Sequence, residues 1–369
     1  MARALGFIGE NRDDPRALVI VFLRGGADGL SLVPPVGDDD YHRARPRLRI
    51  TEGDAVRLDD HFALHPRLSA MHPLFAAGRL AVVHGAGSED DTRSHFEAQD
   101  LMEHGGFVAG GWLGRFLRLR ETGGGASLGA VALGTELPEA LRGAPSAVML
   151  RSLSDLSLAR VTPSWMAALE SLYAAHDGEI RHAAVNTFGM LRRLQGISAP
   201  VAAMYPGDSF GSALSQVATL IKARVGLEAA CVDLGGWDSH FSQQTLMDPL
   251  ITRLGDGLAA FARDLGPALD STTIIVMTEF GRRVTENASF GTDHGRGSVM
   301  FLLGGGVQGG RVLSGWRGLS TEALEGPGDV PVTTNYRDVL APILARHGAD
   351  LVLGSVFPNF DLRPVTLYG

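Results

Sequence analysis

Ala17-Leu-Val-Ile-Val-Phe-Leu23 is a continuous apolar run that stops at Arg24-Gly-Gly-Ala-Asp28-Gly29. An apolar run without polar alternation is typical of a strand that is buried on both faces, as in a parallel sheet. The glycine-rich segment after it predicts a turn that carries one carboxylate. These thirteen residues therefore predict a central sheet with both faces covered.

The rest of the chain alternates between strand-like and helix-like patterns. Four more apolar runs predict strands, at 80–83, 229–233, 272–277 and 299–303. Helical patterns predict three helices, over 212–225, 246–265 and 336–347. This alternation predicts an α/β fold with a predominantly parallel sheet sandwiched by helices. We expect a single domain over 17–365 with an inserted, mainly helical segment at about 150–205.

The composition excludes several classes of protein. The 369 residues include 33 basic and 41 acidic side chains, a net charge of −8 that argues against a nucleic-acid partner. The single cysteine, Cys231, excludes an internal disulfide framework and a metal site built from cysteines. No apolar run reaches the roughly 18 residues of a membrane span. Residues 1–10 lack an export-signal pattern, so the sequence as given predicts a cytoplasmic protein.

Acidic and histidine side chains follow four of the predicted strands. Ligands of open α/β sheets bind beyond the carboxyl ends of the strands, so we expect these side chains to meet there. In chain order the polar residues after strands are Asp28; His84, Thr92, Ser94 and His95; Asp233, Asp238 and His240; and Thr278, Glu279, Arg282, Asp293 and His294. Any one of them could be a turn or capping residue, but the joint pattern favours a metal site.

Oxygen and nitrogen ligands without thiolates suit a divalent zinc, manganese, iron or magnesium ion. The predicted metal ligands are Asp28, Asp238, His240, Glu279, Asp293 and His294. Taken alone, the Asp238-Ser-His240 and Thr292-Asp-His294-Gly segments could equally be solvated or glycine-rich turns. If the prediction is correct, these ligands converge on one pocket at the carboxyl ends of the strands.

Ser94 stands at the predicted start of a helix. A hydroxyl there faces free N–H groups and the positive end of the helix dipole, which would stabilise an anionic nucleophile or a bound oxyanion. Serine is also a favoured helix N-cap, so both interpretations remain open. Arginines in the same loops could bind an anionic substrate, and they are Arg93, Arg24, Arg282 and Arg296. Of these, Arg93 and Arg282 are our candidate catalytic residues beside Ser94.

Two further motifs match known signatures but lack the structure that those signatures need. Gly304-Gly-Gly306-Val-Gln-Gly309 fits a dinucleotide-binding pattern, yet no helix start follows it, and an NAD-linked enzyme would rest on this motif alone. Gly207-Asp-Ser209-Phe-Gly211 fits a nucleophile elbow, yet the prolines before it make a poor strand. We expect a loop without a helix at 304–310, and a helix capped by Ser209 away from the site.

The order of these motifs resembles the alkaline phosphatase and sulfatase superfamily. More closely, it resembles the largely bacterial family labelled domain of unknown function 1501. The closer similarity covers about 17–365, and six segments carry it: 23–30, 93–99, 235–240, 278–282, 292–295 and 333–338. The family's members often carry an export signal, which implies a periplasmic location if a leader has been removed.

The superfamily resemblance implies roles for several residues. Asp28 matches a metal-bridging aspartate after the first strand, and Ser94 matches the nucleophile that heads its helix, with Thr92 as the alternative. Asp233 and Asp238 match an acid and an aspartate five residues apart. The resemblance also implies that His294 matches a late histidine ligand.

The chain departs from the superfamily pattern at two points. His240 follows Asp238 by two residues, where the phosphatases have a histidine after four. Glu279-Phe280 stands in place of an Asp-His pair, so one histidine ligand is missing. These departures leave room for one metal, for a different metal, or for a site that binds without turnover. Cys231 lies inside a predicted strand, which excludes an ordinary formylglycine sulfatase.

The resemblance implies a metal-dependent hydrolase of phosphate- or sulfate-type esters, with a serine or a metal-bound water as the nucleophile. Its partner would be a small-molecule or polymer-borne anionic ester. The alternative is a non-catalytic metal- or anion-binding or scaffold protein that retains the fold.

Overall fold

The computed structural model describes residues 16–120, 128–156, 163–175, 178–194, 197, 202–349 and 353–369. Within these ranges nine strands form one sheet: β1 (Ala17–Arg24), β4 (Leu80–Gly87), β5 (Gly129–Leu133), β6 (Ala147–Leu150), β7 (Leu227–Gly235), β8 (Thr272–Met277), β9 (Ser298–Gly304), β10 (Arg311–Ser314) and β11 (Thr334–Asn335). The strand order is β10-β4-β9-β8-β1-β7-β5-β6, and β11 pairs with β4. β2 (Val56–Arg57) and β3 (Ala63–Leu64) form a separate hairpin.

β1 lies between β7 and β8 and is parallel to both. Phe22 is in register with Asp233 on one side and Met277 on the other, so the chain leaves these three strands at the same edge of the sheet. In the described sheet only β9 is antiparallel to its neighbours, β4 and β8. The prediction of a predominantly parallel sheet is therefore confirmed.

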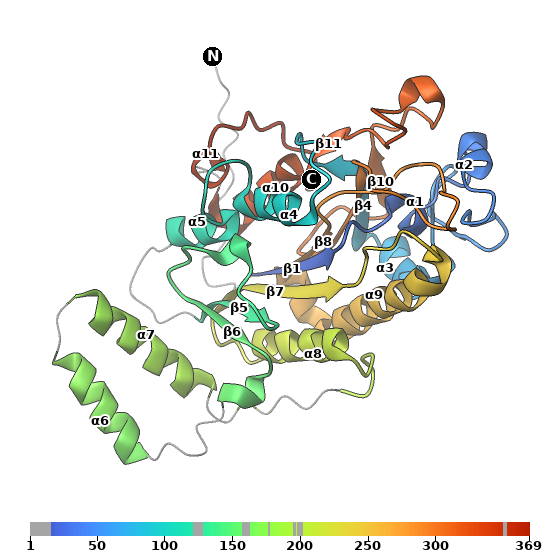
Figure 1. Cartoon of the computed structure of the whole chain (residues 1–369). Helices are drawn as coiled ribbons and strands as arrows, with labels where there is room; N and C mark the ends of the chain where they lie inside the picture. The colour runs from blue at the N-terminus through green and yellow to red at the C-terminus, as the bar shows by residue number, and fades with distance from the viewer. Residues whose placement is uncertain are drawn as a thin grey trace.

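Helices cover both faces of the sheet (Figure 1). The helices of the structure are α1 (Gly29–Leu32), α2 (Asp39–Ala44), α3 (His72–Ala76), α4 (His95–His104), α5 (Trp112–Leu119), α6 (Pro163–Ala174), α7 (Glu179–Leu194), α8 (Ser209–Lys222), α9 (Gln243–Leu265), α10 (Tyr336–Leu344) and α11 (Leu353–Val356). Side chains of β1 alternate between two cores: Leu18 and Ile20 pack with α5 and α10, whereas Val19 and Val21 pack with α8 and α9. The predicted sandwich is confirmed.

The predicted strands and helices are present, with β8 at its predicted limits and the helix ends shifted by up to three residues. The sequence did not predict β5 and β6. Gly129-Ala-Val-Ala-Leu133 is rich in small residues and Ala147-Val-Met-Leu150 has only four residues, so neither segment gives a clear strand signal. Parallel pairing of β5 with the buried β7 stabilises them instead.

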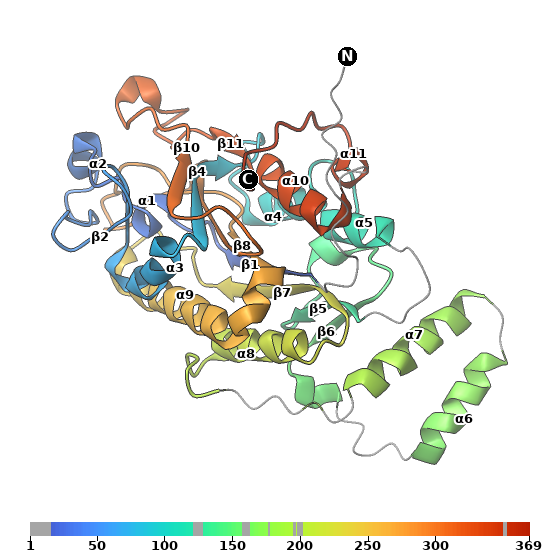
Figure 2. The ribbon, with the colours of Figure 1, turned by 180° about the vertical axis from the view of Figure 1, so that it is seen from behind.

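Helices α6 and α7 lie within the segment predicted as a helical insertion. In both ribbon views they lie beside each other and away from the sheet (Figure 1, Figure 2). Parts of that segment, 157–162, 176–177, 195–196 and 198–201, are outside the described residues. A single domain over 17–365 with this insertion stays a prediction.

The segments 304–309 and 207–211 lack the helix and the strand that their motifs need, as predicted, but the predicted cap at Ser209 is wrong. β9 ends at Gly304 and β10 begins at Arg311, with no helix between them. In the described stretch 202–208 no strand leads into Ser209. However, the cap of α8 is Asp208, whose carboxylate accepts a hydrogen bond from the Gly211 N–H at 2.8 Å, and Ser209 is the first helical residue. Aspartate is as good a cap as serine and comes one position earlier.

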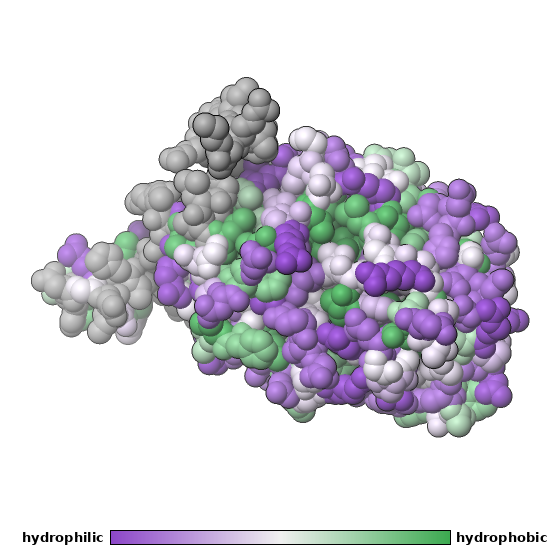
Figure 3. All heavy atoms as spheres, turned by 90° about the horizontal axis from the view of Figure 1, so that it is seen from above, coloured by the Kyte–Doolittle hydropathy of each residue, from purple (hydrophilic) through white to green (hydrophobic). Residues whose placement is uncertain are grey.

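Among the described residues no helix is both long and apolar enough to cross a membrane. The face seen in Figure 3 carries hydrophobic patches among hydrophilic residues.

Candidate metal centre

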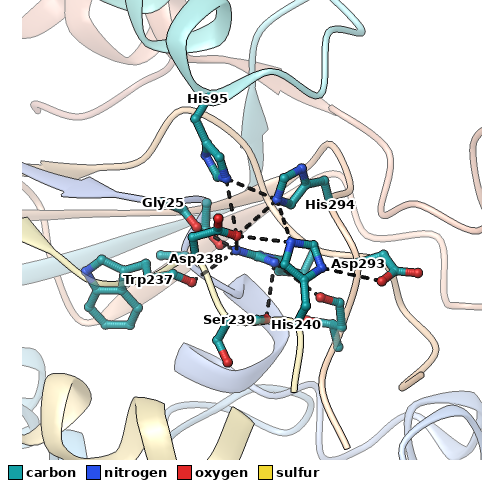
Figure 4. Close-up of polar contacts among 12 residues, drawn as sticks. Gly25, His95, Trp237, Asp238, Ser239, His240, Asp293 and His294 are labelled. Atoms are coloured by element: carbon teal, nitrogen blue, oxygen red, sulfur yellow. Dashed lines mark hydrogen bonds and ion pairs between the residues drawn. The ribbon is translucent and has the colours of Figure 1, made fainter. Parts of the chain in front are cut away.

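Three histidines and one aspartate meet beyond the carboxyl ends of the strands (Figure 4). His95 is the first residue of α4, Asp238 and His240 follow β7, and His294 lies between β8 and β9. Asp238 Oδ1 lies 3.3 Å from Nε2 of His95 and 3.1 Å from Nε2 of both His240 and His294. The Nε2 atom of His294 is also 3.0 Å from those of His95 and His240.

Glycines allow the loops that carry these side chains to approach one another. Gly25 has φ +120° and packs against the loop after β7. A Cβ added to Gly25 would stand 2.4 Å from the backbone nitrogen of Asp238. At Gly291 an added Cβ would stand 2.4 Å from the His240 carbonyl. A larger residue at either position would push the loops apart.

Each histidine turns its second ring nitrogen toward an acceptor. His95 Nδ1 lies 2.8 Å from Glu279 Oε1, and His294 Nδ1 lies 2.9 Å from the Arg93 carbonyl. His240 Nδ1 lies 3.5 Å from Asp293 Oδ1. A hydrogen on Nδ1 satisfies these acceptors and leaves the Nε2 lone pair facing the centre, which is the arrangement found around protein-bound metals.

The donor set fits a divalent cation. In the metal-free chain these Nε2 atoms can share hydrogens with one another and with Asp238 as N–H···N and N–H···O hydrogen bonds, and a bound cation would take the place of those hydrogens. Zinc bonds of about 2.0–2.2 Å in tetrahedral geometry separate ligand atoms by roughly 3.3–3.5 Å, close to the 3.0–3.3 Å found among His95, Asp238 and His294. His240 contacts Asp238 and His294 but is not part of this mutually close set. Ligand atoms of His95, Asp238 and His294 all lie within 4.8 Å of one another. Imidazole with one carboxylate suits zinc and other first-row metals.

Asp238 is held in its ionised form. Burial alone would raise its pKa, but hydrogen bonds with His294 and Arg282, and the charges of His95 and Arg282, outweigh this and place the pKa well below its usual range. The pKa of His95 is raised, chiefly by its hydrogen bond with Glu279. Burial is the largest influence on His294 and lowers its pKa. An imidazole with a lowered pKa is more often neutral and available as a ligand.

Arg282 lies beneath the cluster and not at its open side. Its side chain is buried, and Nη2 donates to Asp238 Oδ1 at 3.0 Å and to the Gly25 carbonyl at 2.6 Å. Its Nε donates to the Gly26 carbonyl at 2.7 Å. Arg282 was predicted to bind substrate, but its donors are committed to the carbonyls of converging loops. We assign it to positioning Asp238.

Two predicted ligands lie behind the histidines. Glu279 is buried, and its Oε1 accepts hydrogen bonds from His95 Nδ1, Gln99 Nε2 and the Gly25 N–H, each at 2.8 Å. Asp293 faces His240 Nδ1 in the same way and also accepts from Asn287. Both carboxylates therefore orient histidine rings, and the structure does not place them among the converging ligand atoms.

Asp28 has another partner. Its carboxylate forms two hydrogen bonds with the buried Arg45, at 2.5 and 3.0 Å, and accepts from Gln243 at 2.6 Å and Ser31 at 2.7 Å. It also caps α1 through the Leu30 N–H. Because these donors occupy its oxygens, the structure removes Asp28 from the candidate ligands.

Ser94 precedes α4 directly, as predicted, but its exposed hydroxyl makes no capping hydrogen bond. Thr92, the alternative, donates to Glu97 at 2.8 Å. Arg93 pairs with the buried Asp329 at 2.6 Å and also donates to the His294 carbonyl. Arg93 therefore helps to fix the loop of His294.

His95 is the member of the cluster that the sequence prediction left out of the ligand set. His95 follows the strand at 80–83, and this position is the signal that could have identified it. The neighbouring Ser94 fits a helix start and a nucleophile, so the prediction assigned the site role to Ser94. The other predicted anion-binding arginines are engaged as well: Arg24 pairs with Asp233 and Glu103 at 2.6 Å each, and Arg296 pairs with Glu325 at 2.6 Å.

A mostly parallel sheet with a histidine and aspartate cluster at the carboxyl ends of its strands defines an α/β protein with a candidate metal centre. The chain belongs to the family described as protein of unknown function (DUF1501), whose model matches residues 15–357. The resemblance to this family noted in the sequence is confirmed. No protein with a curated description matches the chain.

Solved structures of low identity resemble the chain. A structure of Ps i-CgsB in complex with k-i-k-neocarrahexaose is 10% identical, with TM-score 0.42, over 93% of this chain and 74% of that one. Alkaline phosphatase from the Antarctic bacterium TAB5 is 11% identical, with TM-score 0.38, over 82% and 95%. The C-terminal periplasmic domain of EcEptC from Escherichia coli, in complex with Zn, is 9% identical, with TM-score 0.37, over 79% and 73%. Similarity at these values carries no argument for activity.

Proposed function

We propose that this protein is a metal-dependent hydrolase of phosphate- or sulfate-type esters. In this proposal His95, Asp238 and His294 hold one divalent ion, with His240 beside them as a further ligand candidate, and zinc matches a set of imidazoles with one carboxylate. The observation that carries the proposal is the convergence of three Nε2 atoms on Asp238 Oδ1 within 3.3 Å. We propose one ion because Arg45 already neutralises Asp28, the predicted ligand that follows β1.

A bound divalent ion stabilises negative charge on ester oxygens and lowers the pKa of a hydroxyl or water that contacts it. Neighbouring residues of the chain orient the histidine ligands and keep the aspartate ligand ionised. Glu279 and the Arg93 carbonyl fix the rings of His95 and His294, so that these ligands keep their orientation when a substrate approaches. Asp238 stays ionised because Arg282 lies against it.

Ser94 is the candidate nucleophile within this proposal. Its hydroxyl is exposed, directly precedes the ligand His95, and stands at the start of the ten-residue helix α4. The first N–H groups of a helix and its dipole stabilise negative charge at this position. Water is the alternative nucleophile.

A non-catalytic metal-binding protein is the second candidate, and one observation favours it. Arg24, Arg93, Arg282 and Arg296, the arginines predicted to bind an anionic substrate, are each engaged by an acid or by backbone carbonyls. A phosphate or sulfate ester would then depend on the metal for most of its charge neutralisation.

Elemental analysis of the purified protein and an ester hydrolysis assay test the proposal. We expect about one equivalent of divalent metal per chain, with hydrolysis of phosphate or sulfate esters, and loss of both in Asp238→Ala. Asp233→Ala is the matched control because Asp233 lies near the carboxyl end of β7 but pairs with Arg24. Metal without hydrolysis of any phosphate or sulfate ester would support the binding protein instead, and a metal-free protein that takes up no divalent ion would refute both.

A further inference from the structure

Exposed phenylalanines stand close in the sequence to the residues of the candidate metal centre. Four phenylalanines of the described chain are exposed: Phe96 (86%), Phe107 (75%), Phe241 (61%) and Phe290 (50%). Phe96 directly follows His95, Phe241 directly follows His240, and Phe290 lies in the loop that carries His294. Single exposed apolar side chains are ordinary, but three next to one polar site form the kind of apolar surface that marks ligand binding.

Phe290, with φ 62°, and Ser242 next to Phe241, with φ 44°, have a left-handed backbone conformation. Bulky residues rarely adopt this left-handed region, and such conformations persist where the surroundings enforce them, often at ligand sites. Here the Ser242 N–H donates to the Ser289 carbonyl at 2.9 Å and the Gln243 N–H donates to the Phe290 carbonyl at 2.8 Å. These bonds tie the segments of Phe241 and Phe290 together.

The charged groups at this edge are largely occupied. Arg93 and Arg282 are paired, and the Arg47 guanidinium lies 4.5 Å from the centre of the Phe290 ring, where it covers one face. An ester that reaches the metal ligands would therefore meet hydrocarbon on Phe96 and Phe241 beside them. This arrangement favours a substrate whose organic part is apolar over a sugar phosphate or another polyanion.

We propose that Phe96, Phe241 and Phe290 form an apolar rim that binds the organic part of the ester, and that this part is an aryl or similarly flat apolar group. The inference rests on the proposed function, because it places the anionic end of the ester at the metal centre. Offset or edge-to-face contacts with aromatic rings change affinity by about two- to tenfold each.

Calorimetric titration of the zinc-loaded full chain with two phosphonates tests the rim without turnover. We expect naphthylphosphonate to bind at least about tenfold more tightly than methylphosphonate. Phe96→Ala and Phe241→Ala should each weaken naphthylphosphonate binding about two- to tenfold and leave methylphosphonate binding unchanged. Phe107→Ala is the matched control, an equally exposed phenylalanine outside the rim, and should change neither.

Equal binding of the two phosphonates by the wild type, or an equal loss in Phe107→Ala, overturns the rim. If methyl and aryl esters are hydrolysed at the same rate, the proposed function stands and the rim is overturned. If no ester is hydrolysed but the naphthyl preference disappears in Phe96→Ala, the rim stands and the proposed hydrolase fails. A dimer that Phe96→Ala dissociates, with neither phosphonate bound, identifies the surface as a contact between copies of this chain and overturns the inference.

Discussion

Two polar clusters lie at the same edge of the sheet and differ in the partners that surround their aspartate. In the first, Asp28 follows β1 and its carboxylate meets the fully buried guanidinium of Arg45. In the second, Asp238 follows β7 and its Oδ1 lies within 3.3 Å of the Nε2 atoms of three imidazoles. The Asp28 carboxylate is enclosed by Arg45 and neutral donors, whereas Asp238 pairs with Arg282 on one side and faces three imidazoles on the other.

The difference shows that the position of an aspartate after a strand does not by itself make it a ligand. Both carboxylates come at the carboxyl ends of parallel strands, where ligands collect. What separates them is the partner that the rest of the fold supplies. Asp28 accepts hydrogen bonds from Arg45, Ser31 and Gln243, so its role is complete without a ligand. Asp238 is about half exposed and open to a cation.

We expect the largest loss of stability from a substitution that disrupts the cluster around Asp28. Arg45→Met leaves the buried Asp28 charge unpaired, which we expect to lower the free energy of unfolding by about 3–5 kcal/mol. In the metal-free protein, His294→Ala should lower it by only about 1 kcal/mol, because the partner Asp238 is about half exposed and can bond to water instead. Urea unfolding of both variants measures the contrast.

Asp28→Asn combined with Arg45→Met is the control for the first cluster, since it removes both charges together. We expect it to recover part of the loss seen in Arg45→Met. If His294→Ala destabilises the metal-free protein as much as Arg45→Met does, the two clusters do not differ in the way described, and the second is a structural network.

The second prediction concerns the binding of a divalent cation to the cluster around Asp238. A divalent ion that binds the folded chain alone raises the free energy of unfolding by about 2.7 kcal/mol at a free concentration of 100 times its dissociation constant. We expect zinc to stabilise the wild type in this way and to leave His294→Ala unchanged. Thermal unfolding with and without zinc measures it, with Asp233→Ala as a control that keeps the effect. Equal stabilisation of His294→Ala would place the bound ion elsewhere.

The sequence predicted the sheet well and the site in part. The run at 17–23 is apolar at every position, so burial of β1 on both faces followed from the pattern alone. The edge where Asp238, His240 and His294 meet followed from the rule that parallel strands end together. β5 was missed because a five-residue, alanine-rich strand is stabilised by its neighbours and not by its own propensity.

The assignments that changed depend on contacts between distant residues. No pattern around Asp28 shows that Arg45 returns to it through α2, and no pattern around Arg282 shows that it lies beneath Asp238. Glu279 was placed at the correct edge of the sheet, but only the structure shows that its carboxylate lies behind His95. Sequence reasoning located the site, whereas packing decided which polar groups face its centre.

The third prediction concerns the residues that orient the histidines. Glu279→Gln should weaken zinc binding about 10–100-fold, the usual cost of losing a partner that holds a metal-binding histidine. Asp293→Asn should cost less, because Asp293 lies 3.5 Å from His240, compared with 2.8 Å between Glu279 and His95. Competition with a chromogenic chelator measures both affinities. The reverse order would mean that His240, and not His95, is the more important ligand.

The smallest expected effect on stability separates the two interpretations of Ser94. A serine that caps a helix contributes about 0.5–2 kcal/mol, but the Ser94 hydroxyl makes no capping hydrogen bond. Ser94→Ala should therefore leave the free energy of unfolding and the zinc affinity almost unchanged, in contrast to Arg45→Met and Glu279→Gln. If Ser94 is the nucleophile, the same variant should lose most ester hydrolysis. A variant that keeps full activity would assign the attack to water, and one that loses about 1 kcal/mol of stability with full activity would restore Ser94 to the role of a helix cap.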